Sequence, residues 1–331
     1  MLSRVADSIY WMSRYVERAE SVARFIDVNY QLMLDLPTVG GAQQWEPLVV
    51  ITGDFAEFRK LYAASSEQSV IRFLTFDRRN PNSIISCLRG ARENARSIRE
   101  IISSEMWEQL NTFYLMVTQT AAATSEADEV SYEFFTSVKQ ASHLFLGITD
   151  ATLTHNAGWH FHRLGRMIER ADKTSRILDV KYFLLSPEEA GNPAPVDDLQ
   201  WSALLRSASA FEMFRKAHGR VTPERVVSFL LLDQEFPRAI RYSLIRAQQS
   251  LHIVSGTPLG TFSSAAEQLL GQLRAELDYA QVQDILAAGL HDFLDLLQHR
   301  LNRIGDSICE TLFGLRPAAH ATQAQSQNLP G

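Results

Sequence analysis

The sequence predicts an all-α fold, a helical bundle made of two tandem, diverged copies of one multi-helix unit. Apolar residues recur at alternating steps of four and three from Val5 to Met33, which places them on one stripe of a single long helix. No run of alternating apolar and polar residues bounded by hairpin turns occurs elsewhere in the chain. Residues of the first half recur in the second half at a nearly constant spacing, which indicates an internal repeat.

The first helix is expected to end at the helix-breaking residues Pro37, Gly40 and Gly41. After it, each copy is expected to contain a second helix, a short third helix, a fourth helix that begins at a proline, and two more. Pro81 and Pro237 are assigned to the first turn of the fourth helix, because the missing N–H of proline costs little there.

The repeat is visible at two offsets. At an offset of 152, Arg14-Tyr-Val-Glu17-Arg18-Ala19-Glu20 aligns with Arg166-Met-Ile-Glu169-Arg170-Ala171-Asp172, and the match continues through Arg24/Arg176, Asp27/Asp179 and Val28/Val180. At an offset of 156, further matches run from Trp45/Trp201 to Ala91/Ala247. We therefore predict a tandem duplication.

These matches assign residues 1–152 to a first helical repeat and residues 153–316 to a second one. The two repeats are expected to pack as one globular unit. The segment between the first two helices is longer in copy two, at residues 186–198, and contains Pro187, Pro193 and Pro195. Residues 317–331 are rich in Ala, Gln and Ser, which predicts a disordered tail.

The composition narrows the class of protein. Hydrophobic residues make up 46% of the 331 residues and charged residues 21%, which is typical of a globular chain. The net charge of −6 argues against a general nucleic-acid binder, since such proteins need a basic face. The two cysteines, Cys87 and Cys309, exclude a disulfide framework and a Cys-rich zinc site. No signal peptide and no membrane span is recognised, so we expect a soluble, cytoplasmic protein.

One charged helix face stands out. Arg14, Glu17, Ser21 and Arg24 follow one another at steps of three, four and three, so they share one face, which Arg18 flanks. Of the 15 aligned positions from 14 to 28, seven are identical between the copies, and five of those are charged. A solvated face of weak ion pairs would be expected to diverge. The constraint therefore indicates either a buried polar network between the copies or a ligand site that holds an anion through bidentate arginines.

A second basic stripe belongs to copy one alone. Arg92, Arg96 and Arg99 stand at steps of four and three, whereas copy two has Gln248, His252 and Ser255 there. The stripe is interpreted either as a solvated helix face or as part of an asymmetric binding site. His160 and His162 are two residues apart on a predicted helix and point in different directions, so no metal site is predicted, and no cofactor motif is recognised.

Several segments resemble the alpha-E family, which is bacterial, all-helical and poorly characterised. They are Met1-Leu-Ser-Arg-Val-Ala6, Tyr10-Trp-Met-Ser-Arg-Tyr-Val-Glu-Arg-Ala-Glu20, Ala91-Arg-Glu-Asn-Ala-Arg96 and Trp159-His-Phe-His-Arg-Leu-Gly-Arg-Met-Ile-Glu-Arg-Ala-Asp172. At Ser13 the family more often has glycine. Family members are typically encoded beside ATP-grasp-type carboxylate–amine ligases and transglutaminase-like proteins, so the resemblance implies a role in peptide modification or amide formation.

The leading interpretation is a non-catalytic helical partner of such a ligase that binds a peptide or carboxylate substrate. One alternative is an enzyme with Glu17 or Glu169 as general base and arginines holding an anionic substrate. Another is a structural scaffold with a buried Arg/Glu network. The candidate ligand- or partner-binding residues are Arg14, Glu17, Arg18, Glu20, Arg24, Arg92, Arg96, Arg163, Arg166, Glu169, Arg170, Asp172 and Arg176.

Overall fold

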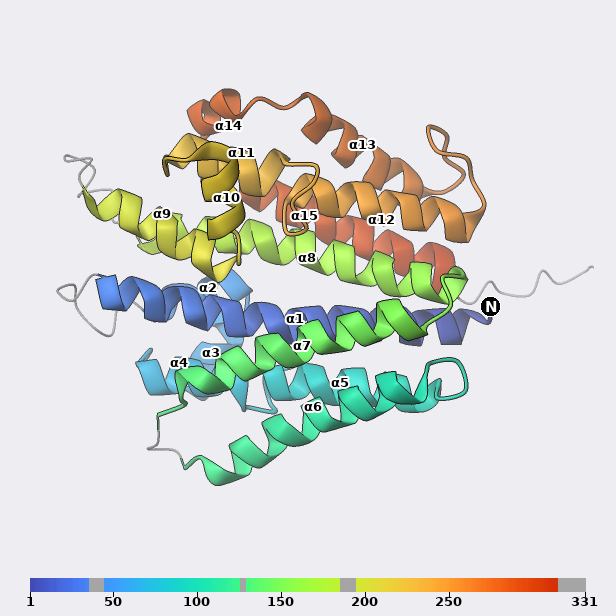
Figure 1. Ribbon diagram of the computed structural model, residues 1–331, viewed down its shortest axis with the longest axis horizontal. Helices are drawn as coiled ribbons and strands as arrows, with labels where there is room; N and C mark the ends of the chain where they lie inside the picture. Colours follow the sequence, from blue (N-terminus) through green and yellow to red (C-terminus); the bar gives the residue numbers. More distant parts are fainter. Residues whose placement is uncertain (36–44, 126–128, 185–194, 315–331) are drawn as a thin grey trace, which may run out of the picture.

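The computed structural model describes residues 1–35, 45–125, 129–184 and 195–314, and these residues contain helices and no strand (Figure 1). The prediction of an all-α fold is therefore confirmed. None of the described helices is both long and apolar enough to cross a bilayer. The predicted disordered tail, 317–331, lies outside the described residues, as does most of the predicted linker at 186–198.

The first half of the chain contains seven helices among its described residues. They are α1 (Ser3–Asp35), α2 (Glu46–Thr52), α3 (Phe55–Leu61), α4 (Glu67–Thr75), α5 (Ile84–Ser97), α6 (Ser104–Ala123) and α7 (Tyr132–Thr152).

The second half follows the same order of long and short helices. Its described helices are α8 (Ala157–Leu184), α9 (Pro195–Ser207), α10 (Phe211–His218), α11 (Pro223–Leu232), α12 (Ile240–Ser255), α13 (Ala265–Tyr279), α14 (Val282–Ala288) and α15 (Leu290–Ile308), followed by a π-helical turn at Cys309–Phe313. The short helix α14 lies between two longer helices, α13 and α15. No helix stands at the corresponding place, between α6 and α7, among the described residues of the first half.

Serine residues cap the N-termini of several helices. Ser83, Ser103 and Ser131 accept hydrogen bonds from backbone N–H groups in the first turns of α5, α6 and α7, which satisfies a donor that the helix itself leaves unpaired. The assignment of Pro81 and Pro237 to the first helical turn is wrong. Each proline lies in the turn three residues before its helix, and the helices begin at Ile84 and Ile240. These prolines shape the approach to the helix.

The two long helices α1 and α8 run side by side and parallel through the middle of the molecule (Figure 1). On one side α1 contacts α5 and α7, and on the other side α8 contacts α12 and α15. Both helices are therefore surrounded by protein along most of their length. The two helices that carry the repeated charged residues therefore lie together.

The closest approach of α1 and α8 is at Gly165. A Cβ atom at this position would lie well inside van der Waals distance of the backbone carbonyl oxygen of Tyr10 and of Ser13 Oγ. The Ser13 hydroxyl is in turn fixed, because it donates to the Tyr10 carbonyl oxygen at 2.8 Å. Glycine at 165 therefore sets the spacing of the two central helices.

Substituting Gly165→Ala is expected to lower the free energy of unfolding by about 1–3 kcal/mol, because the backbone of α1 must move to admit a methyl group. The sign is the informative part, since Gly→Ala inside a helix ordinarily stabilises by about 0.5–1 kcal/mol. Gly147 in α7 is the matched control: its added Cβ meets no atom within 4 Å, so Gly147→Ala should stabilise. Urea unfolding of both variants gives the comparison, and a stabilised Gly165→Ala protein would refute the close approach.

Candidate functional site

Two reciprocal ion pairs cross the contact between α1 and α8. Arg170 on α8 donates from Nε and Nη2 to the two carboxylate oxygens of Glu17 on α1, both at 2.7 Å. In the opposite direction, Arg18 on α1 donates from Nε to Glu169 Oε1 at 2.7 Å and from Nη2 to Oε2 at 3.1 Å. In each Glu-Arg dipeptide, therefore, the glutamate accepts from an arginine of the other helix and the arginine donates to a glutamate of the other helix.

Glu169 binds a second arginine and a lysine. Arg14 Nε donates to Glu169 Oε2 at 2.8 Å, and the Arg14 Nη1 group donates to the hydroxyl of Tyr10 at 3.2 Å. Lys173 Nζ lies 3.5 Å from Glu169 Oε1. The Glu169 side chain is 1% exposed, so three cations surround one carboxylate that has almost no access to water.

A second reciprocal pattern joins each central helix to a short helix of the other half. Arg24 on α1 donates from Nη1 to the Ser207 carbonyl oxygen at the end of α9, at 2.7 Å. Arg176 on α8 donates from Nη1 to the Ile51 carbonyl oxygen near the end of α2, at 2.6 Å. A guanidinium at a helix C-terminus satisfies carbonyls that the helix leaves unpaired and complements its dipole. Each arginine also pairs with an acid four residues earlier, Glu20 or Asp172.

Glu20 is the most heavily hydrogen-bonded of these acids. Its carboxylate accepts from Arg24, Arg238 and Ser142, and Oε1 lies 3.0 Å from His143 Nε2. Arg238 also lies 3.5 Å from Glu17. The comparison of the two halves does not single out Arg238, because Asn82 stands at the matching position, where it accepts from Arg18 at 2.7 Å. We refer below to Glu17, Glu20, Glu169, Asp172 and the cations bonded to them as the Arg/Glu network.

The carboxylates of Glu169 and Glu20 are held in the ionised form. Burial alone opposes the ionisation of Glu169, but Arg18, Lys173 and Arg14 outweigh it and hold its pKa well below the ordinary value. The same holds for Glu20. Burial raises its pKa, but Arg238 and Arg24 outweigh this effect and hold the pKa well below the ordinary value. A general base works best when its pKa lies near the working pH. This geometry therefore argues against Glu169 as a catalytic base.

The charged face of α1 is buried, which agrees with the first of the two alternatives drawn from the sequence, a buried polar network. Glu17 is 3% exposed, Glu20 1% and Arg24 1%, and the α1 face that carries them is covered by α8, α9 and α7. The structure brings together nine of the residues selected from sequence, namely Arg14, Glu17, Arg18, Glu20, Arg24, Glu169, Arg170, Asp172 and Arg176.

The other four selected arginines lie outside the network. Arg163 Nε donates to Ser250 Oγ on α12 at 2.7 Å, and Arg166 forms no hydrogen bond to a described residue. On the surface of α5, Arg92 donates to Asn111 at 2.7 Å and lies over the rings of Trp107 and Tyr114, whereas Arg96 is paired with Glu93. The two stripes predicted from sequence are therefore separate in space.

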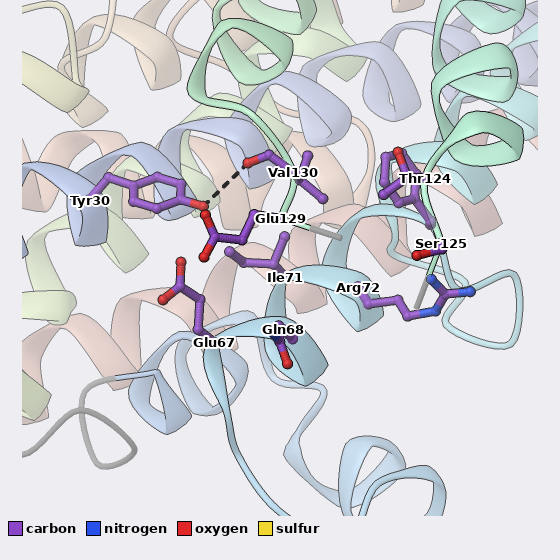
Figure 2. A pocket seen from close by; sticks show the side chains of 10 residues that line it. Tyr30, Glu67, Gln68, Ile71, Arg72, Thr124, Ser125, Glu129 and Val130 are labelled. Carbon is purple, nitrogen blue, oxygen red and sulfur yellow. Dashed lines mark hydrogen bonds between the residues drawn. The ribbon is translucent and has the colours of Figure 1, made fainter. Parts of the chain in front are cut away.

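A pocket that the sequence analysis did not predict is lined by two carboxylates, those of Glu67 and Glu129, and by Tyr30 (Figure 2). Tyr30 of α1 donates to the Val130 carbonyl oxygen at 3.5 Å, and the carboxylates of Glu67 and Glu129 lie on the side of the Tyr30 hydroxyl. Burial and the neighbouring Glu129 raise the pKa of Glu67. Among the described side chains, no cluster of three His, Cys, Asp or Glu residues has the arrangement needed to bind a metal ion.

The fold and the network define an all-helical protein whose two central helices are joined by reciprocal Glu–Arg pairs. The chain belongs to the Alpha-E family, described as a predicted alpha-helical domain with a conserved ER motif, whose model matches residues 1–313. Two Glu-Arg steps of this chain, Glu17-Arg18 and Glu169-Arg170, lie in the network. A third, Glu224-Arg225, is exposed on α11.

The chain is also similar to uncharacterised proteins of Mycobacterium bovis and of two strains of Mycobacterium tuberculosis. Each is 22% identical over 335 residues, a match that covers 94% of this chain and 37% of the relative. The chain thus spans little more than a third of the length of these relatives. No solved structure matches it.

Proposed function

We propose that this chain is a helical accessory protein that acts with an ATP-grasp-type carboxylate–amine ligase in peptide modification or amide formation, and that it binds a peptide or carboxylate substrate for that ligase. The partner, together with a transglutaminase-like protein, follows from the resemblance to the alpha-E family.

The observation that carries the non-catalytic part of the proposal is the closure of the Arg/Glu network. Glu17 and Glu169, the candidate catalytic bases, already accept hydrogen bonds from arginines at both carboxylate oxygens. Their side chains are 3% and 1% exposed, so a substrate has no access to them without displacing a helix. The role that this geometry favours for the network is to hold α1 against α8 at a fixed register.

We further propose that the two halves, with boundaries near residues 1–152 and 153–316, are diverged copies that pack as one unit. The support is the reciprocity of the contacts. The bonds of Arg24 to the Ser207 carbonyl and of Arg176 to the Ile51 carbonyl correspond at an offset of 152 for the arginines and 156 for the carbonyl residues. The pair Glu17–Arg170 becomes Glu169–Arg18 when 152 is added to one residue and subtracted from the other. Lys139–Asp27 and His291–Asp179 are a further pair at this offset.

The partner role is tested by co-purifying the full chain with a ligase encoded beside it, and by measuring amide formation with and without the chain. Complex formation and a rate that depends on the chain support the proposal. A ligase that neither binds the chain nor changes its rate would overturn it. The Glu169→Gln variant reports on catalysis separately, because loss of the chemical step in a folded complex would indicate an enzyme.

The basic stripe on α5 supplies a sharper variant for the same assay. Replacing Arg92 by Gln and Arg96 by His imports the residues of the second half, so the fold should persist. The variant loses the stacking of Arg92 on Trp107, which costs about 0.5–1 kcal/mol. Affinity for an acidic partner is expected to fall, most at low salt, where charge attraction is least screened.

The control removes the same charge elsewhere on the first half, by Arg59→Gln plus Lys60→Gln on the exposed end of α3. Titrations at two salt concentrations compare the variants. Equal affinities for the two double variants and the parent chain would identify the α5 stripe as an ordinary solvated face.

A further inference from the structure

The contact between α8 and α12 is lined by arginines along its whole length. The two helices are antiparallel, since Arg163 bonds to Ser250 at one end and Arg170 reaches the Pro237 carbonyl oxygen at the other. Arg163, Arg166 and Arg170 share one face of α8 at steps of three and four. Tyr242, Arg246 and Ser250 form the facing row of α12 at steps of four.

Among the described residues, the arginines of this contact are hydrogen-bonded to carboxylates at its inner end alone. Arg170 and Arg238 are bonded to Glu17 and Glu20. At the outer end, neither Arg163 nor Arg246 is hydrogen-bonded to a carboxylate in the described part of the chain: Arg163 donates to a serine, and Arg246 donates to Gln249 at 3.2 Å. Positive charge therefore accumulates toward the open end of the contact.

Arg166 lies between the two ends and is the least satisfied of these arginines. Its Nε is buried and has no hydrogen-bond partner. The matching residue of the first half, Arg14, has both Glu169 and the Tyr10 hydroxyl. Arg166 has no corresponding partners. Both carboxylate oxygens of Glu17 accept from Arg170, and the position that corresponds to Tyr10 is occupied by His162. Burial and the nearby Arg170 lower the pKa of Arg166 to about 10, which leaves it cationic at neutral pH.

The outer end opens at the surface. Arg163 forms one wall of a depression of about 390 Å³ that is also lined by Gln249, His252, Ile253, Thr257 and Leu259. Tyr242 connects to the cluster, because the Arg246 guanidinium lies 4.9 Å from its ring centroid. Burial and the nearby Arg246 lower the pKa of Arg163, so these two guanidinium groups lie close together. In the first half the positions of Arg163 and Arg246 are held by Trp11 and Gly90, so this arrangement belongs to the second half.

We propose that Arg163, Arg166 and Arg246 form a binding site for a phosphate group at the outer end of the α8–α12 contact. A buried guanidinium nitrogen without a hydrogen-bond partner, such as Arg166 Nε, is costly, and an anion that binds beside it recovers part of that cost. Three guanidinium groups without a carboxylate partner suit a doubly charged oxyanion better than a single carboxylate. The apolar side chains of Ile253 and Leu259 at the depression would contact the organic part of a phosphorylated ligand. The site does not depend on the proposed ligase partnership.

The test uses the full chain alone, with inorganic phosphate, citrate and acetate as probes at equal ionic strength. Calorimetric titration is expected to show saturable binding of phosphate, and binding of acetate at least tenfold weaker. Citrate binding equal to that of phosphate would instead assign the site to a polycarboxylate. Arg166→Met should abolish phosphate binding and raise the unfolding midpoint of the phosphate-free chain, because it replaces an unpaired buried charge by an apolar side chain.

Arg246→Gln keeps Arg166 in place and is the second variant, with an expected loss of at least tenfold in phosphate affinity. Arg59→Gln on the exposed end of α3 removes the same charge far from the site, and it should bind phosphate as the parent chain does. The proposal is overturned if the parent chain shows no saturable binding of phosphate, or if the Arg166 and Arg246 variants bind it unchanged. Both results are independent of whether a ligase associates with the chain.

Discussion

Replacing Glu169 by alanine is expected to lower the free energy of unfolding by about 3–5 kcal/mol, a large part of the stability of an ordinary domain. The substitution removes the one carboxylate shared by Arg14, Arg18 and Lys173, and three cations then remain close together with little water. Glu17→Ala acts through the same mechanism on Arg170 and should cost about 3 kcal/mol. Urea unfolding monitored by circular dichroism measures both.

Two further variants separate charge imbalance from lost packing. Adding Arg18→Met to Glu169→Ala should recover part of the loss, because one uncompensated cation disappears. Glu57→Ala removes a glutamate from an exposed pair with Lys60, whose side chains are 56% and 65% exposed, and should cost less than about 0.5 kcal/mol. A Glu169→Ala protein that is no less stable than Glu57→Ala would show that the network contributes nothing.

The second large effect is acid unfolding. The pKa values of Glu20, Glu169 and Asp172 lie below those of ordinary carboxyls, because their neighbouring arginines outweigh the effect of burial. A depressed folded-state pKa gives stability that is fully present above the unfolded pKa of about 4.5 and is lost as the pH falls toward the folded value. These three groups should therefore change the free energy of unfolding little between pH 7 and pH 5. The two glutamates should lower it by up to about 1.4 kcal/mol per pH unit each below pH 4.5, and Asp172 adds a similar slope below pH 3.8, which gives about 4 kcal/mol per pH unit in all.

Unfolding curves between pH 7 and pH 3 provide the measurement. In a Glu20→Gln chain the slope below pH 4.5 should be shallower by about 1.4 kcal/mol per pH unit, since one titrating group is removed. The comparison of slopes cancels the contribution of carboxylates outside the network. Equal slopes for the parent chain and the Glu20→Gln chain would contradict the assignment of a depressed pKa to Glu20.

The sequence alone predicted the all-α class and the residues at the centre of the network, because buried charges tolerate little change. Identical residues stand at Arg14, Glu17, Arg18 and Arg24 and at the positions 152 residues later, whereas the apolar residues Ile26 and Leu178 differ and have similar volumes. The identity of each partner was not predictable, because spacing along one helix does not say which neighbouring helix covers it. That α1 is enclosed on its polar face as well became evident only from the packing of α8 and α9.

Residues outside the repeat pattern escaped prediction for a physical reason. Arg238 bonds to Glu20 and approaches Glu17, yet the first half has Asn82 at the matching position, where an amide is sufficient to bind Arg18. The two residues differ in type and bind different partners, so a search for residues that are identical in the two halves does not find either of them. The acidic pocket at Tyr30 and Glu67 escaped notice for the same reason, since it joins segments that have no special spacing in the sequence.

The reciprocal contact of α1 with α8 has the form of an isologous interface, in which one surface patch serves as its own complement. Each side supplies the acid that the other side needs and receives a base in return. A substitution on one helix therefore leaves a charged residue of the other helix without its ion-pair partner. The two residues of a pair are far apart in the chain, for example 153 residues for Glu17 and Arg170. Substitutions at these two positions should be correlated among homologues, and an exchange of acid and base is tolerable only when both positions change together.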